Sequence, residues 1–173
     1  MKKLLLMAAF AVFGFTTVSA QGDDDHGPIQ EGKWLIEINT GSWTTGSTAF
    51  SLVSVDGDTQ WSIGAEGGYF VKENLAVKAG FGFSDFGNDF SAFSYKVGAK
   101  YYIANEFPVG VDYTGTSFKD FEENPSYIGI EGGYAWFVTP KVSIEPKLRY
   151  NVSMNDDFYD SALQFLIGFA IHL

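Results

Sequence analysis

The chain has 173 residues, 46% of them hydrophobic and only 18% charged, which suits one folded domain and excludes intrinsic disorder. Cysteine is absent, so no disulfide framework, thiolate nucleophile or zinc–thiolate site is available. The formal net charge of −10 argues against a nucleic-acid partner, because phosphate contacts need clustered lysine and arginine side chains.

The N-terminal residues 1–20 have the pattern of a cleaved secretory signal peptide. Two lysines precede an apolar stretch over residues 4–15, and Val18-Ser19-Ala20 forms a small-residue cleavage site. The apolar stretch is short for a membrane-spanning helix, and a retained N-terminal anchor is the alternative. Residues 21–31 are polar and lack periodicity, so we expect a flexible periplasmic leader there.

From Gly32 onward, apolar residues recur at every second position, which is the period of a β-strand. One face of each segment carries large aliphatic and aromatic side chains, and the other carries glycine, alanine and isolated charges. Most segments match the roughly 9–11 residues that a tilted strand needs to cross a bilayer. The predicted strands are residues 32–39, 60–70, 75–83, 92–103, 107–114, 127–137, 141–151 and 162–173.

The small and charged face is unusual for a surface in contact with water, but it suits the crowded interior of a narrow barrel. We therefore predict an all-β fold over residues 32–173, an eight-stranded antiparallel up-and-down transmembrane β-barrel with its large apolar side chains toward lipid. A soluble, lipocalin-like barrel is the alternative. It would place its large side chains around an interior ligand cavity and its charges outside.

Short and long connections alternate along the chain. The gaps at 71–74, 104–106 and 138–140 are tight, and antiparallel pairing places them all at one end of the barrel. Outer-membrane barrels have short periplasmic turns and longer extracellular loops. The long gaps are residues 40–59, 84–91, 115–126 and 152–161. Their acidic residues are Asp56, Asp58, Asp85, Asp89, Asp120, Glu122, Glu123, Asp156, Asp157 and Asp160.

The first long gap contains a further segment with strand character, Thr48–Val55, followed by the hairpin signal Asp56-Gly57. This segment either extends the first two strands or folds over the mouth of the barrel. The sequence leaves both placements open.

The inward faces carry five acidic and five basic residues, so the charge of the interior sums to zero. Hairpin pairing places Glu66 near Lys78, Asp112 near Lys100, and Glu131 near Lys147. Because an unpaired buried charge costs several kcal/mol, we expect a salt-bridged plug, with a proton or small-ion path along the network as the alternative. The predicted network is Glu37, Glu66, Lys78, Lys96, Lys100, Asp112, Glu131, Glu145, Lys147 and Arg149.

Aromatic residues on the outward faces predict two belts at the membrane interfaces. The belt near the short turns comprises Trp34, Tyr69, Phe107 and Trp136, and the belt near the long loops comprises Trp61, Phe93, Tyr113 and Tyr150.

The signal peptide, the eight alternating strands with alternating loop lengths, and the ending Gly168-Phe169-Ala170-Ile171-His172-Leu173 together resemble the OmpA/OmpX-type outer-membrane β-barrel family. Residues 68–77 (GYFVKENLAV) are similar to the second hairpin of its small single-domain members. The resemblance covers residues 32–173 and implies a place in the Gram-negative outer membrane. It also implies a C-terminal signal for the barrel-insertion machinery, carried by Gly168, Ile171 and Leu173.

The small members of that family include adhesion and envelope-integrity proteins, narrow channels and hydrolases. The barrel hydrolases need a histidine near the outer rim as general base, whereas this chain offers His26 in the leader and the penultimate His172. We therefore expect no enzyme, no catalytic residue, no cofactor and no metal site. The prediction is a structural, adhesive or surface-interaction barrel, with a narrow channel for ions or small solutes as the alternative.

The resemblance also implies the partners. These are outer-membrane lipid and lipopolysaccharide, together with the insertion machinery and periplasmic chaperones during biogenesis. We expect a monomer with no nucleic-acid partner. Divalent cations bridging the acidic loops to lipopolysaccharide are an open alternative, because carboxylate oxygens suit Ca²⁺ and Mg²⁺.

Overall fold

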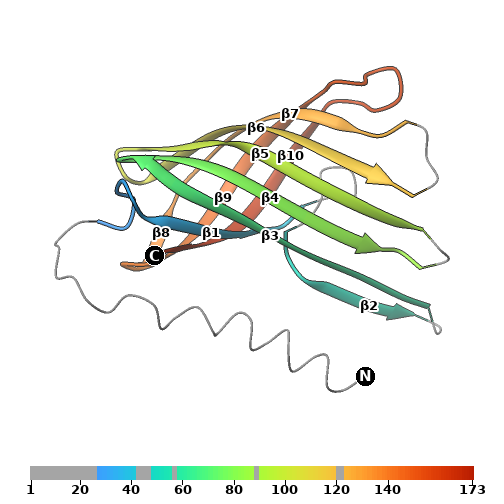
Figure 1. Ribbon diagram of the computed structural model, residues 1–173, viewed down its shortest axis with the longest axis horizontal. Coiled ribbons are helices and arrows are strands. Elements are labelled where there is room, and N and C mark those ends of the chain that lie inside the picture. The colour runs from blue at the N-terminus through green and yellow to red at the C-terminus, as the bar shows by residue number, and fades with distance from the viewer. Residues whose placement is uncertain (1–26, 42–47, 56–57, 88–89, 120–122) are drawn as a thin grey trace.

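The computed structural model describes residues 27–41, 48–55, 58–87, 90–119 and 123–173 (Figure 1). Within these residues, ten strands form one antiparallel sheet, which closes into a barrel because β1 pairs with both β10 and β3. No helix in this described part of the chain could span a membrane. The strands are β1 (Trp34–Asn39), β2 (Ser51–Val55), β3 (Asp58–Lys72), β4 (Leu75–Asp85), β5 (Ser91–Ile103), β6 (Phe107–Phe118), β7 (Ser126–Gly133), β8 (Trp136–Thr139), β9 (Val142–Ser153) and β10 (Ala162–His172).

The ten strands make an eight-stranded wall, because two positions in the wall are each filled by two strands in succession. β1 and β2 both pair with β3, and β7 and β8 both pair with β9. This confirms the predicted eight-stranded antiparallel barrel. One predicted strand, residues 127–137, is interrupted between Gly133 and Trp136. There the Ala135 N–H donates to the Glu106 carbonyl (2.7 Å) of a neighbouring turn instead of continuing the ladder, and the Ala135 side chain is buried.

The two ends of the barrel differ in their connections. At one end, which we call the turn end, the connections are residues 73–74, 104–106 and 140–141. At the opposite end, the loop end, they are residues 86–90, 119–125 and 154–161. Several strands run further toward the loop end than the alternation predicted, so the loops predicted at 84–91 and 115–126 are shorter than expected.

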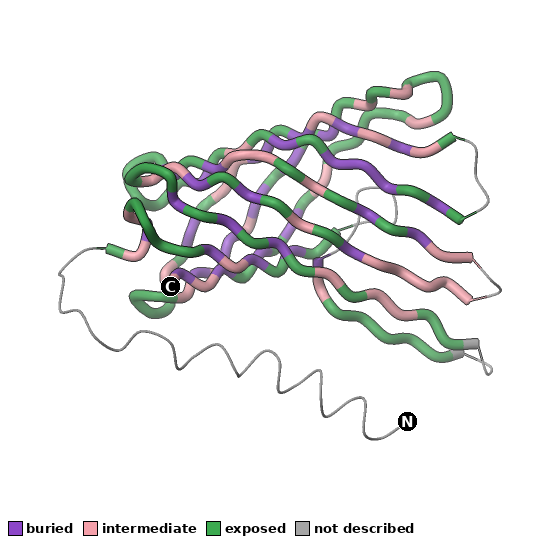
Figure 2. The backbone as a smooth tube through the Cα atoms, viewed as in Figure 1, coloured by how far each residue is buried: buried purple, intermediate pink, exposed green. Residues whose placement is uncertain are grey.

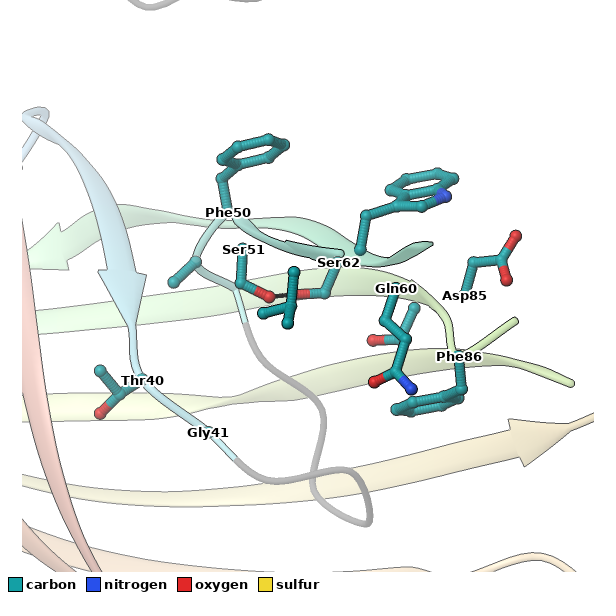
Figure 3. Close-up of a pocket in the computed structure, with 12 residues that line it drawn as sticks. Thr40, Gly41, Phe50, Ser51, Gln60, Ser62, Asp85 and Phe86 are labelled. Carbon is teal, nitrogen blue, oxygen red and sulfur yellow. Dashed lines mark hydrogen bonds between the residues drawn. The ribbon is translucent and has the colours of Figure 1, made fainter. Parts of the chain in front are cut away.

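The Thr48–Val55 segment extends the wall. Its residues form β2, which pairs antiparallel with β3 from Ser51 opposite Ser62 to Val55 opposite Asp58 (Figure 3). The Ser51 and Ser62 hydroxyls lie 2.9 Å apart across this ladder. The alternative of folding over the mouth is therefore wrong for this strand. The predicted Asp56-Gly57 turn lies outside the described residues.

Burial alternates along the strands, as Figure 2 shows. On β1, Leu35, Glu37 and Asn39 are buried, whereas Trp34 and Ile38 face outward and are exposed. Large outward side chains elsewhere are also exposed, for example Leu163 at 69%. The charged side chains lie inside and the large apolar ones outside, which contradicts the lipocalin-like alternative.

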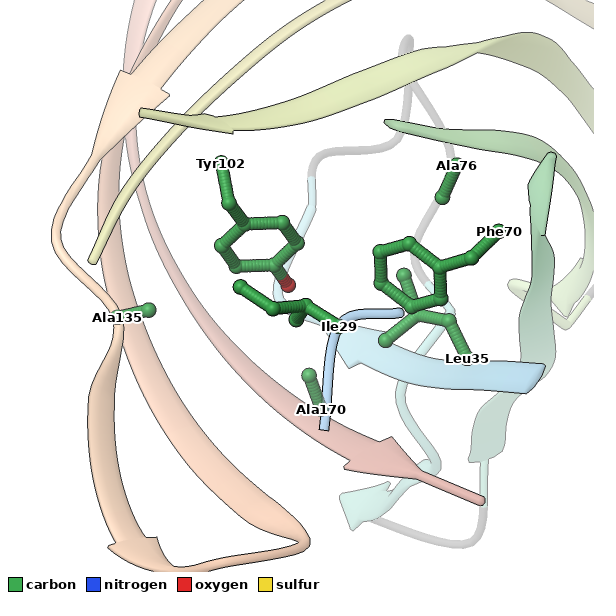
Figure 4. Close-up of a cluster of buried hydrophobic side chains, with 7 residues drawn as sticks. All are labelled: Ile29, Leu35, Phe70, Ala76, Tyr102, Ala135 and Ala170. Carbon is green, nitrogen blue, oxygen red and sulfur yellow. The ribbon is translucent and has the colours of Figure 1, made fainter. Parts of the chain in front are cut away.

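A short segment before β1 closes the interior at the turn end. The side chain of Ile29 packs into an apolar cluster formed by Leu35, Phe70, Ala76, Tyr102, Ala135 and Ala170 (Figure 4). The Ile29 carbonyl accepts the Asn74 N–H at 2.8 Å, and the Gly32 N–H donates to the Phe70 carbonyl at 2.9 Å.

The prediction of a flexible leader over residues 21–31 is therefore wrong for its last residues, because the side chain of Ile29 and a backbone hydrogen bond to its carbonyl fix them to the barrel. Residues 21–26 and the predicted signal peptide lie outside the described part of the chain.

Replacing Ile29 with alanine should leave a cavity in this cluster and lower the free energy of unfolding by about 2–5 kcal/mol. Urea unfolding in phospholipid vesicles, followed by tryptophan fluorescence, measures the change. Glu31→Ala is the matched control, because Glu31 is exposed in the same segment. Equal stability of the two variants would show that Ile29 does not seal the turn end.

Candidate functional site

The interior holds the charged residues that the alternation predicted. All ten lie on the inner faces of seven strands, β1, β3, β4, β5, β6, β7 and β9. Nine of them are buried, and the side chain of the tenth, Lys96, is 14% exposed. This inner face follows from the period of two, since every second residue of a closed sheet points toward the axis.

Glu37 lies at the centre of the network. Its carboxylate accepts from the ammonium groups of Lys78 at 2.7 Å, Lys100 at 2.8 Å and Lys147 at 3.2 Å. A carboxylate has about four acceptor positions and can bind several donors at once. The three lysines come from β4, β5 and β9, so one carboxylate on β1 ties together strands that are distant around the barrel wall.

Each of these three lysines also contacts a second carboxylate. Lys78 Nζ lies 2.7 Å from Glu66, Lys100 Nζ lies 2.5 Å from Glu145, and Lys147 Nζ lies 3.4 Å from Glu131. The network is therefore continuous, with four carboxylates bridged by three ammonium groups, and Lys96 adds a contact to Glu66 at 3.5 Å.

A second cluster lies around Arg149. Its guanidinium binds Asp112 in a two-pronged ion pair, with Nη2 2.7 Å from Oδ1 and Nη1 against Oδ2. Its Nε donates to Asn151 at 2.7 Å, and the Thr114 hydroxyl donates to Asp112 at 2.7 Å. Arg149 Nη1 lies 3.6 Å from Glu131, which joins this cluster to the network around Glu37.

Two of the three predicted hairpin pairs lie within ion-pair distance, Glu66 with Lys78 and Glu131 with Lys147. The third predicted pair, Asp112 with Lys100, is wrong. Asp112 instead binds Arg149, and Lys100 binds Glu37 and Glu145. The reason is geometric, because hairpin reasoning considers only adjacent strands, whereas these long side chains reach further. Arg149 on β9 reaches Asp112 on β6 over Gly129 of the intervening β7, and Lys100 on β5 reaches carboxylates on β1 and β9.

Glycines on the inner faces make room for these long side chains. A Cβ atom at Gly129 would overlap the guanidinium of Arg149, and one at Gly98 would overlap the Cβ of Asp112. At Gly110 an added Cβ would come within 2.9 Å of Glu131 Cγ. The alternation of glycine with charge therefore has a packing cause, since Arg149, Asp112 and Glu131 each lie against a residue that has no side chain.

Polar side chains that the sequence analysis assigned no role complete the hydrogen bonds at the turn end. Glu145 Oε1 accepts from the hydroxyls of Tyr102 at 2.8 Å and Ser143 at 3.0 Å. His172 Nε2 lies 3.3 Å from the Ser143 hydroxyl, and its ring lies against Phe70 and Phe137. Their inward position in the alternation was the signal that could have identified them.

His172 is buried under the Ile29 cluster at the turn end, at the opposite end of the barrel from the connections 86–90, 119–125 and 154–161. It therefore cannot reach a substrate at the loop end. His26 lies outside the described residues.

The predicted aromatic belt residues face outward. Seven of them are exposed, and Trp61 is half-buried. Trp34 packs edge-on against Tyr69 with ring centroids 5.1 Å apart, and Trp61 packs against Phe83 at 5.4 Å. Tyr113 lies near the middle of β6, opposite Val97 and Ile128, further from the loop end than the pattern predicted.

The C-terminal residues close the barrel. The backbones of Leu173 and Trp34 exchange two hydrogen bonds, at 2.8 and 3.0 Å, and Ile171 pairs with Ile36 on one side and Val142 on the other. A Cβ atom at Gly168 would overlap Asn39 Oδ1, so this glycine has a packing role. Its role in the insertion signal stays a prediction.

Part of the acidic surface at the loop end is described. The Asn155 amide donates to Glu123 at 3.1 Å and the Tyr159 hydroxyl donates to the Glu123 carbonyl at 2.9 Å, which ties two loops together. Asp156, Asp157 and Asp160 are exposed, Asp85 is half-buried, and Asp58 begins β3. Asp56, Asp89, Asp120 and Glu122 lie outside the described residues.

In the part of the chain that is described, no group of three or more acidic or histidine residues is arranged to hold a metal ion.

Comparisons with known proteins concern the fold. No protein-family model and no curated protein matches the sequence. The structure of the Yersinia pestis outer membrane protein Ail in a phospholipid bilayer nanodisc matches with a TM-score of 0.50 and 17% identity, over 83% of this chain and 100% of that one. The N-terminal β-barrel domain of Pseudomonas aeruginosa OprF matches with a TM-score of 0.54 and 9% identity, over 82% and 97%.

The chain therefore has the fold of the small eight-stranded outer-membrane β-barrels. The resemblance to the OmpA/OmpX-type barrels predicted this fold from the sequence.

The glycine packing provides a test of the interior network. Gly129→Ala should displace the Arg149 guanidinium from Asp112 and lower the free energy of unfolding by about 1–3 kcal/mol, the usual cost of overpacking. Gly132→Ala is the matched control on the same strand, because its Cβ would lie at an ordinary 4.0 Å from Val109. Urea unfolding in vesicles compares the two, and equal losses would contradict the proposed packing.

Proposed function

We propose that the protein is an integral outer-membrane β-barrel with a plugged interior that serves a structural, adhesive or surface-interaction role through its loop end. The observation that carries the proposal is the continuous buried network around Glu37 and Arg149 inside a wall whose outward side chains are apolar. Lipid favours large apolar side chains on the outside of a barrel, and eight strands leave an interior that side chains just fill.

The orientation follows from the general asymmetry of such barrels. Short turns face the periplasm and longer loops face outward, which places the Ile29 cluster at the periplasmic end. The acidic residues Glu123, Asp156, Asp157 and Asp160 then lie on the outer surface, with lipopolysaccharide as a neighbour. The N-terminal signal pattern and the C-terminal Gly168, Ile171 and Leu173 are consistent with export and insertion into this membrane.

A role at the surface of the loop end is supported because the described interior offers neither a general base at the outer rim nor a free path for solutes. The buried His172 lies at the turn end, so it cannot act as a general base at the outer rim, and we propose a protein without enzymatic activity. The interior charges are paired with one another rather than arranged around a free path. This leaves the loop end as the surface for interaction. Ail, whose name is attachment invasion locus protein, shares the fold.

The purified protein should give no steady open steps in planar lipid bilayers, because paired side chains fill the interior. Current recorded at fixed voltage is the measurement, made on protein extracted from the outer-membrane fraction. Folding is checked by a shift in gel mobility between boiled and unboiled samples in SDS.

Steady unitary current steps from protein that shows the boiling shift would contradict the plugged barrel and support the narrow channel instead. Recovery of the protein only in the soluble periplasmic fraction, with no boiling shift, would contradict the membrane location itself.

A further inference from the structure

A hollow of about 440 Å³ lies at the loop end, on the inner face of the strands β2, β3 and β4 (Figure 3). It extends beyond the interior charge network, and none of the ten network residues lines it. Its volume falls within the range of small-molecule sites, which is roughly 300–1,000 Å³. The question is which chemistry this hollow would accept.

A row of three serines crosses the floor of the hollow. Ser62 on β3 lies directly opposite Ser51 on β2 and directly opposite Ser84 on β4. The Ser51 and Ser62 hydroxyls share one hydrogen bond of 2.9 Å. Because each hydroxyl has one donor and two acceptor positions, both retain capacity for a ligand. The Gln60 amide, on the next inward position of β3, adds donors and an acceptor of its own.

An aromatic ring stands beside these polar groups. In Figure 3 the side chains of Phe86 and Gln60 point to the same side of the strands, whereas Phe50 and Asp85 point to the other side. The Phe86 ring lies 5.2 Å from that of Phe90, which stacks on Phe118 at 5.6 Å. This stack holds Phe86 in place as a flat apolar wall.

The charges of the lining narrow the class of ligand. No lysine or arginine is among the described residues that line the hollow, so an anionic group such as a phosphate would be desolvated without a counter-charge. Among the described residues of the lining, Asp85 alone is charged, and its side chain points to the other side of the strands. The hollow therefore favours an uncharged group with many hydroxyls and one apolar face.

We propose that this hollow binds a neutral sugar ring. The C–H face of the ring packs on Phe86, and its hydroxyls exchange hydrogen bonds with Ser62, Ser84 and Gln60. The sugar comes either from a free saccharide or from the headgroup of a glycolipid in the outer leaflet. This inference rests on the proposed function only in that the loop end must face outward.

The test uses the full mature chain in phospholipid nanodiscs, in which both ends of the barrel are exposed to solvent. Amide chemical shifts are followed by NMR while maltose is added, and separately in nanodiscs that contain a glucosyl diacylglycerol. We expect saturable shifts at Ser51, Ser62 and Ser84. A response to maltose assigns the site to free saccharide, and a response only to the glycolipid assigns it to a headgroup.

Variants separate a specific site from general perturbation. Ser62→Ala and Gln60→Ala should each weaken binding about tenfold, as expected for a lost hydrogen bond that leaves a ligand hydroxyl unpaired. Phe86→Leu should weaken it as well, while the control Ser117→Ala on the exposed face of β6 should bind like the native chain. The gel shift on boiling confirms that every variant is folded.

The proposal is overturned if neither sugar source gives saturable shifts, if the variants bind like the native chain, or if inorganic phosphate binds more tightly than both sugar sources. Because the bilayer current and the membrane location are measured independently, failure of sugar binding would leave the proposed plugged barrel standing.

Discussion

The requirement that charge be neutralised inside a narrow barrel governs the rest of this structure. Glu37 accepts three lysine ammonium groups, and each of those lysines contacts a second carboxylate. A buried ion pair contributes little net stability over a hydrophobic pair, but removing one partner is strongly destabilising. The network therefore acts mainly as a constraint, because each of the seven contributing strands must supply its charge at a fixed position or leave another charge unpaired.

Other features follow from that constraint. The long charged side chains need space, which glycines such as Gly98 and Gly129 provide on the neighbouring strands. The Ile29 cluster of apolar side chains closes the network at the turn end. The usual arrangement of a soluble protein is thus inverted, with polar groups inside and large apolar side chains outside.

The sequence was sufficient for the wall of the barrel and for the identity of the inward charges, because the period of two is a local property. It could not assign partners beyond the adjacent strand, since Arg149 on β9 reaches Asp112 on β6 over Gly129 of the strand between them. Ile29 was missed because a single apolar residue in a polar segment has no periodicity. The break at Ala135 was missed because a hydrogen bond to the Glu106 carbonyl, remote in sequence, causes it.

The most direct test of the central claim is the free energy of unfolding of Glu37→Gln in phospholipid vesicles, with Glu31→Gln as the matched control. The glutamine keeps the shape of the side chain but leaves the interior with one uncompensated positive charge among three lysines. We predict a loss of about 3–5 kcal/mol for Glu37→Gln, the range for breaking a buried ion pair, and no measurable loss for the exposed Glu31→Gln. Equal stability of the two variants would contradict the account, because the interior charges would then not constrain the barrel.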